Sequence, residues 1–372
     1  MKRKNKKNGQ RFGQILGALL YLLIGALCGL LLGREDEVLA GSRARMLLLV
    51  LAAFYLSMFL QIAIHEAGHL VFGLLTGYRF VSYRVFGLMW IRQDGRLRFR
   101  RYSLAGTGGQ CLLAPPDWRE DLPYALYNLG GVLMNLITAA LFALAAPFTA
   151  PLLRIFLRIA AIIGLGFALM NGLPLRIGPV DNDGRNLLSI RRSPAARRAF
   201  WLQMRVAAAS ADGLRLRDMP EEWFSVPGDD DPENSIIAAV PVNRALRLMD
   251  AQRFAEAAEL QDRLCAREDL PGVYRGLLTA DRITCELLGA GDPGRIEALL
   301  SKEQRQFMRA MRSSPSVLRT QIALCLLRDH DAAAAEKLRA DFEKAAAAYP
   351  YPADIEGERE LLALIAQRAA GC

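Results

Sequence analysis

A chain of 372 residues is long enough for a membrane domain and one soluble domain. Its hydrophobic fraction is 52%, and the apolar residues are concentrated before Pro174, whereas the remainder is charged and rich in alanine. The net charge of +9 does not indicate a nucleic-acid partner, because the basic residues lie in blocks beside apolar segments. Six scattered cysteines without a CxxC pair argue against a disulfide framework and favour reducing surroundings for the soluble part.

Four apolar segments are long enough to cross a bilayer. The first, residues 15–32, follows the basic start MKRKNKKNGQR. It is predicted to be an uncleaved anchor rather than a signal peptide, because it is long and no clear cleavage site of small residues follows it. The other three segments cover residues 46–75, 124–147 and 152–175.

The distribution of basic residues predicts the orientation of these spans. Arginine and lysine gather before the first span, in the loop 79–119 and after residue 175. Because basic loops stay in the cytoplasm, we expect a multi-pass protein of the cell membrane with both termini cytoplasmic. Arg154 and Arg158, near the outer end of the fourth span, count against this topology, but long basic side chains can snorkel to the interface.

The segment His65-Glu66-Ala67-Gly68-His69 lies within the second apolar span. Two histidines four residues apart leave the same face of a helix and can bind one zinc ion. Glu66 lies beside them, where it can accept a proton from a water activated by that ion. A chance match on a buried helix is the alternative, but lipid disfavours two histidines and a carboxylate that nothing pairs.

Zinc needs a third protein ligand. The remaining histidine, His330, lies far away in the soluble part, so a carboxylate is expected. Asp181 and Asp183 follow Asn171-Gly-Leu-Pro174, where glycine and proline end the fourth span and the chain can return toward the second. Spacing alone does not choose between the two aspartates, and both are also compatible with an ordinary polar turn.

Four motifs in combination resemble the site-2 protease family of intramembrane zinc metalloproteases. They lie within residues 46–190 and are His65-Glu-Ala-Gly-His69, Gly131-Val-Leu-Met-Asn135, Asn171-Gly-Leu-Pro174 and Asp183-Gly184. The resemblance implies that His65, His69 and Asp183 bind Zn²⁺ and that Glu66 is the general base. It prefers Asp183 over Asp181, although Asn182 stands where the family usually has a hydrophobic residue. The glycine-rich PDZ-like insertion of many members is not seen.

The resemblance implies an enzyme, a zinc metalloendopeptidase that cleaves a transmembrane or membrane-associated peptide, as in regulated intramembrane proteolysis. A catalytically inactive membrane scaffold, acting through its C-terminal helices, is one alternative. A metal or ion transporter is another, because it also places histidine and aspartate in membrane spans. A transporter does not require Glu66 between two ligands, and four spans are few for alternating access.

Other polar residues near the spans are candidates for substrate binding. Asn135 and Asn171 are expected to hold a substrate carbonyl or the oxyanion, or else to tie helices together. Residues 90–100 predict a β-hairpin with an Asp-Gly turn, which either adds a substrate strand or rests on the membrane. Residues 106–117 are expected to form a flexible loop that gates the zinc site.

The expected fold is mainly α: a membrane domain with about four transmembrane helices, a small β-hairpin and C-terminal helices resembling tetratricopeptide repeats. A plain helical bundle is the alternative for the C-terminal helices, for which we expect a cytosolic protein partner or a role in regulating access. Helix breaks are predicted at Pro271, 289–293, 329–331 and 350–352, and a helix at 201–217. The predicted parts are a cytoplasmic N-terminus (1–13), the metalloprotease domain (14–190), a helix and linker (191–241) and the soluble domain (242–372).

Overall fold

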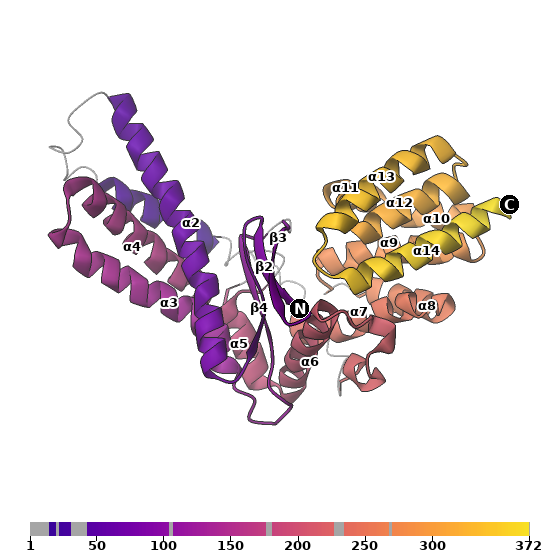
Figure 1. Ribbon diagram of the computed structural model, residues 1–372, viewed down its shortest axis with the longest axis horizontal. Coiled ribbons are helices and arrows are strands. Elements are labelled where there is room, and N and C mark those ends of the chain that lie inside the picture. The colour runs from indigo at the N-terminus through magenta and orange to yellow at the C-terminus, as the bar shows by residue number, and fades with distance from the viewer. Residues whose placement is uncertain are drawn as a thin grey trace. The chain divides into compact units, whose positions relative to one another are not determined.

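The computed structural model describes residues 15–19, 22–30, 43–103, 107–175, 181–226, 234–267 and 270–371. The described residues are mainly helical, with one small set of antiparallel strands (Figure 1). The chain divides into two compact units. The first comprises residues 1–86 and 107–192, and the second comprises residues 87–106 and 193–372.

Three helices of the first unit are long and apolar enough to cross a membrane. They are α2 (Arg43–Leu75), α3 (Tyr124–Ala145) and α4 (Pro151–Gly172). Their apolar stretches agree with the second, third and fourth predicted spans, and they are consistent with a membrane protein. The first predicted span is helical over residues 15–19 and 22–30, but the rest of it, like the N-terminus 1–13, lies outside the described residues.

Helices α2 and α3 approach each other closely at a pair of glycines. A Cβ atom on Gly68 would lie 2.2 Å from the carbonyl oxygen of Gly130, and one on Gly130 would lie 2.5 Å from that of Gly68. Only residues without a side chain allow two helix backbones to pack at this distance. Gly68 is therefore needed within the His65–His69 segment for packing, and the crossing brings α3 beside both histidines.

Two strands of the first unit pair antiparallel, β1 (Arg79–Val85) and β4 (Gly109–Ala114), with Tyr83 opposite Cys111. The expectation of a flexible loop over 106–117 is wrong for residues 109–114. Glycines and prolines flank this short apolar run rather than interrupt it. Six residues are too few to cross a membrane but enough for a buried strand.

The predicted hairpin is confirmed as β2 (Leu88–Gln93) and β3 (Arg96–Arg101). Asp94 and Gly95 both have positive φ angles, 51° and 72°, as a two-residue hairpin turn requires. The hairpin belongs to the second unit, where the Gln93 amide donates a hydrogen bond to the carbonyl of Pro350 at 2.7 Å. The alternating apolar residues of β3, Leu97 and Phe99, are exposed.

The rest of the second unit is helical. The helices are α6 (Pro194–Ala211), α7 (Ser235–Asp250), α8 (Phe254–Cys265), α9 (Gly272–Leu288), α10 (Pro293–Leu299), α11 (Lys302–Ala310), α12 (Pro315–Leu327), α13 (Ala332–Ala348) and α14 (Pro352–Ala370). All four predicted breaks lie where one helix ends and the next begins, and Pro293 and Pro352 are the first residues of α10 and α14. The helix predicted over 201–217 instead covers Pro194–Ala211, because Ser193 caps its start by accepting a hydrogen bond from the backbone of Ala196.

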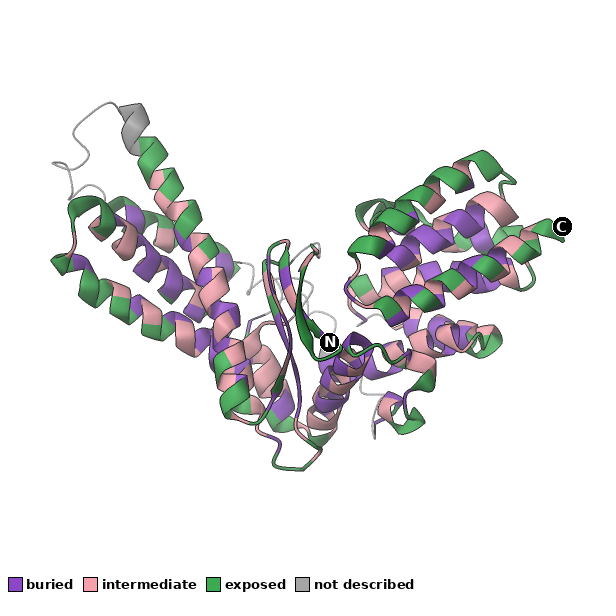
Figure 2. Ribbon diagram, viewed as in Figure 1, coloured by how far each residue is buried: buried purple, intermediate pink, exposed green. Residues whose placement is uncertain are grey.

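One apolar core of this unit lies between α9, α12, α13 and α14, and another lies between α7, α8 and α9. The most buried side chains of the first core include Ile283, Val317, Ile322 and Phe342, each at 0% exposure. Figure 2 shows buried residues along α9 and α12 and exposed residues along the outer helices. Proline stands in the first turn of α10, α12 and α14, where its missing N–H leaves no helical hydrogen bond unmade.

Candidate metal centre

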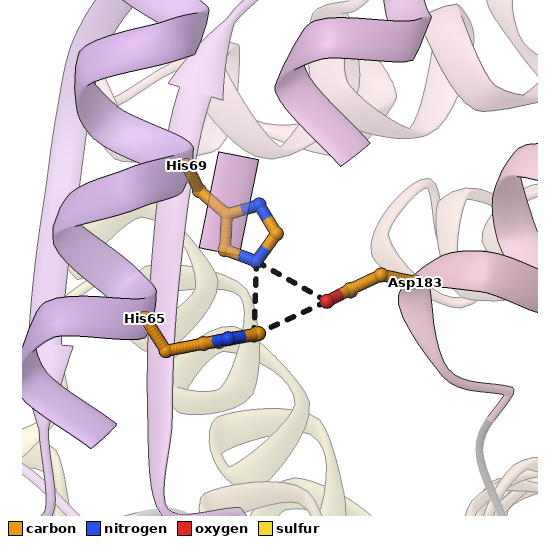
Figure 3. Close-up of side chains that lie close together, drawn as sticks. All are labelled: His65, His69 and Asp183. Carbon is orange, nitrogen blue, oxygen red and sulfur yellow. Dashed lines mark hydrogen bonds and ion pairs between the residues drawn. The ribbon is translucent and has the colours of Figure 1, made fainter. Parts of the chain in front are cut away.

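Three side chains from two elements of the first unit converge on one point (Figure 3). His65 and His69 lie on the same face of α2, and their Nε2 atoms are 3.2 Å apart. Asp183 is the first residue of α5 (Asp183–Arg192), and its Oδ2 lies 3.1 Å from Nε2 of His65 and 3.5 Å from Nε2 of His69. Among the described residues, these three form the one group of three or more potential metal ligands whose ligand atoms lie close together.

The other nitrogen of each imidazole faces an oxygen atom. Nδ1 of His65 lies 2.7 Å from Oδ1 of Asn135, and Nδ1 of His69 lies 2.7 Å from the backbone carbonyl of Tyr127. An oxygen of this kind accepts a hydrogen bond, so each Nδ1 carries the proton. Each Nε2 of the neutral rings is then left with a lone pair that points at its neighbour and at Asp183.

This arrangement fits a zinc ion. Tetrahedral zinc with bonds of about 2.0–2.1 Å holds its ligand atoms about 3.3–3.4 Å apart. The three separations between His65, His69 and Asp183 span 3.1–3.5 Å. Oδ2 of Asp183 is buried without a hydrogen-bond partner. A proton on one ring bridges one edge of this triangle, whereas a cation at its centre satisfies all three lone pairs.

The structure brings Asp183, and not Asp181, to the histidines. Burial by itself raises the pKa of the Asp183 carboxyl. When the two imidazoles carry a second proton, their hydrogen bonds and charge outweigh burial and hold that pKa well below its usual range. A metal ion would take the place of those protons. The carboxylate of Asp181 instead pairs with Nε of Arg185 at 3.0 Å.

Asn182 and Gly184 explain how Asp183 reaches this position. The Asn182 amide donates to the carbonyls of Met170 and Leu173 at the end of α4, and its oxygen accepts from the backbone N–H of Arg185 in α5 at 3.0 Å. A Cβ on Gly184 would lie 2.1 Å from the carbonyl oxygen of Gly172. Asn182, which stands where site-2 proteases usually have a hydrophobic residue, thus joins the ends of α4 and α5. Asparagine is a favoured residue directly before a helix, so the sequence contained an indication of this role.

Glu66 is 9% exposed and lies against β4. A Cβ on Gly109, the first residue of that strand, would lie 2.5 Å from Cγ and from Oε1 of Glu66. The main chain of β4 therefore runs directly beside the carboxylate expected to act as the base. The sequence did not predict this strand, and it offered the hairpin at residues 90–100 either as a substrate-binding edge or as a segment that rests on the membrane.

The two asparagines differ in their contacts. Asn135 is fully buried, and its Oδ1 faces His65 while its Nδ2 donates to Gln61, so both ends of its amide are engaged. These contacts orient a histidine and tie α3 to α2, which is the alternative expected for this amide, and a contact with substrate stays a prediction. Asn171 donates to the carbonyl of Phe167, one turn earlier in its own helix. That contact lies within α4, and a contact between Asn171 and substrate stays a prediction.

Gly131 provides the space for this pairing. A Cβ there would lie 2.4 Å from Cε1 of His65, so a side chain at this position would displace the ring. Gly131 and Asn135 lie four residues apart on α3 and therefore face His65 together.

No protein-family model, curated protein or solved structure matches the chain.

Proposed function

We propose that this chain is an intramembrane zinc metalloendopeptidase. The observation that carries the proposal is the convergence of the His65, His69 and Asp183 ligand atoms at the end of a helix of membrane-spanning length, with Glu66 between the two histidines. These three residues would hold the ion. Zinc, when bound, acts as a Lewis acid toward a water molecule and a peptide carbonyl.

Other residues of the chain would transfer the proton and orient the ligands. Glu66, held against β4, accepts the proton of the attacking water and passes it to the leaving amine. Asn135 and the Tyr127 carbonyl keep the two imidazole rings oriented. A substrate helix in the membrane has its backbone groups hydrogen-bonded internally, so it must unwind before its peptide bond reaches these groups.

The proposal is tested by a Glu66→Gln variant. Glutamine keeps the size and the hydrogen bonding of the side chain but cannot act as the base. Cells with the wild type should contain a membrane peptide that is trimmed, and cells with Glu66→Gln should leave it intact. Both purified proteins should hold about one zinc per chain. Glu303→Gln, at an exposed position on α11, is the matched control. Trimming by Glu66→Gln at the wild-type rate would falsify the mechanism.

We further propose four spans in the cell membrane with both termini in the cytoplasm. Three apolar helices and the basic blocks at either end of the membrane segment support this topology. In a variant whose only cysteine is Cys372, an impermeant thiol reagent should react after the cells are opened and not before. Cysteine placed at Ala150, between α3 and α4, should react in intact cells. The opposite pattern would invert the topology.

A further inference from the structure

Gln61 is a polar residue at 0% exposure in the apolar helix α2, one turn before His65. Its Nε2 donates to the carbonyl of Ala160 on α4 at 2.9 Å. Its Oε1 accepts from Nδ2 of Asn135 on α3 at 2.7 Å, and its backbone carbonyl accepts from the same nitrogen at 3.0 Å. A buried amide in a membrane helix is tolerated when such partners satisfy it.

The partners fix the direction of every hydrogen bond in this chain. The Ala160 carbonyl can only accept, so the NH2 group of Gln61 faces it and the side-chain oxygen of Gln61 faces Asn135. The Gln61 carbonyl can also only accept, so the NH2 group of Asn135 faces Gln61. The oxygen of Asn135 is then left for His65, and Nδ1 of His65 must donate to it.

The orientation of an amide is ordinarily assigned from its surroundings. Here two backbone carbonyls, on α2 and α4, set it without regard to the histidine. Helix α4 also leaves room for the Gln61 amide, since a Cβ on Gly164 would lie 2.6 Å from Nε2 of Gln61. Gly164 lies one turn beyond Ala160 on α4, so acceptor and space come from one face of that helix.

We propose that Gln61 is a positioning residue for the metal centre. Together with Asn135 it forms a relay from the Ala160 carbonyl to His65, and this relay locks the His65 ring as an Nε2 ligand for a divalent metal ion. The inference deepens the proposed function and rests on its metal site. The packing of α4 against α2 should therefore affect metal binding, although α4 contributes no ligand.

The relay is tested on the full-length protein in detergent by two measurements. Zinc affinity is measured by competition with a chromophoric chelator, and the visible absorption of the Co²⁺-loaded protein reports ligand geometry. Gln61→Met keeps the length of the side chain and removes both polar ends. It should weaken zinc binding by about tenfold to a hundredfold, the usual loss when a partner behind a metal ligand is removed, and shift the Co²⁺ spectrum.

Ser57→Ala is the matched control, since Ser57 is also at 0% exposure and lies one turn before Gln61 on the same helix. Its zinc affinity and spectrum should equal those of the wild type. A second pair keeps the test valid if Gln61→Met does not fold. Asn135→Asp retains an oxygen acceptor for Nδ1 of His65, whereas Asn135→Leu does not. The Asn135→Asp protein should therefore bind zinc at least tenfold more tightly than the Asn135→Leu protein.

The relay is overturned if folded Gln61→Met matches the wild type in both measurements, if Ser57→Ala loses as much affinity, or if the Asn135 variants are equal. Failure of the proposed function has a different signature. A wild type that binds zinc but trims no membrane peptide refutes the protease and leaves the relay standing. A wild type that binds no zinc overturns both.

Discussion

Two buried polar clusters, one in each unit, respond to burial in different ways. In the first unit, His65, His69 and Asp183 turn two nitrogen lone pairs and a carboxylate oxygen toward one another. In the second unit, Arg319 is 1% exposed and lies between two carboxylates. Its guanidinium donates to Asp281 at 2.5 Å and to Glu358 at 2.9 Å.

The difference is in the source of the positive charge. The second cluster contains its own cation, and the N–H groups of Arg319 also reach the hydroxyls of Thr284 and Thr320. The first cluster presents acceptors alone at its centre, because both Nδ1 protons point away toward Asn135 and Tyr127. Buried charge by itself therefore does not mark a metal site. Converging acceptors whose donors are all used elsewhere are an arrangement that a metal ion would complete.

The largest expected effect is the loss of the metal. Asp183→Ala should lower zinc from about one ion per chain to almost none, because it removes one of three protein ligands. Asp181→Ala, whose carboxylate pairs with Arg185, should keep the ion. Elemental analysis of the purified proteins measures both. Full retention in Asp183→Ala together with loss in Asp181→Ala would reverse the assignment of the third ligand.

Breaking the second cluster should leave zinc unchanged and reduce stability instead. Arg319→Met leaves Asp281 and Glu358 buried without their cation, which should lower the free energy of unfolding of the second unit by about 3–5 kcal/mol. Denaturant unfolding followed by the helical signal measures the change. Arg359→Met is the control, since Arg359 pairs with Glu343 at the surface and should contribute less than about 1 kcal/mol. Equal losses in the two variants would remove the contrast between the clusters.

The parts of this structure that depend on local sequence could be predicted. Histidines four residues apart share a helix face, Asp94-Gly95 makes a hairpin turn, and prolines mark helix ends, all without knowledge of distant residues. The strand β4 could not be predicted in this way. Its six residues look like a loop between glycines and prolines, and they form a strand because they pair with β1, more than twenty residues earlier.

The site was predictable in its residues and less so in their contacts. The sequence identified Asn135 as an amide in an apolar span. Its contact with His65 could not be predicted, because that contact depends on how α2 and α3 cross at Gly68 and Gly130. The sequence shows that Gln61 lies four residues before His65 and therefore on the same helix face. The role of Gln61 could not be predicted, because it depends on a hydrogen bond to the Ala160 carbonyl of a different helix.

The smallest expected effect concerns Asp354, an acid at the edge of the second cluster. Burial, together with the nearby carboxylates of Glu358 and Asp250, raises the pKa of Asp354 to about 7, and its contact is the Tyr349 hydroxyl at 3.5 Å. An aspartate in an unfolded chain has a pKa of about 3.9. Between these two values the folded state holds a proton that the unfolded state has lost, so stability falls as the pH rises.

The wild type should therefore lose about 1–3 kcal/mol of unfolding free energy between pH 5 and pH 8 through this group. Asp354→Asn stays neutral, so its loss over the same range should be smaller by that amount. Asp341→Asn, at an exposed position on α13, should behave like the wild type. Parallel pH curves for Asp354→Asn and the wild type would show that Asp354 is ionised in the folded protein. A divergence would show that this buried acid, which Arg319 does not contact, takes up a proton on folding.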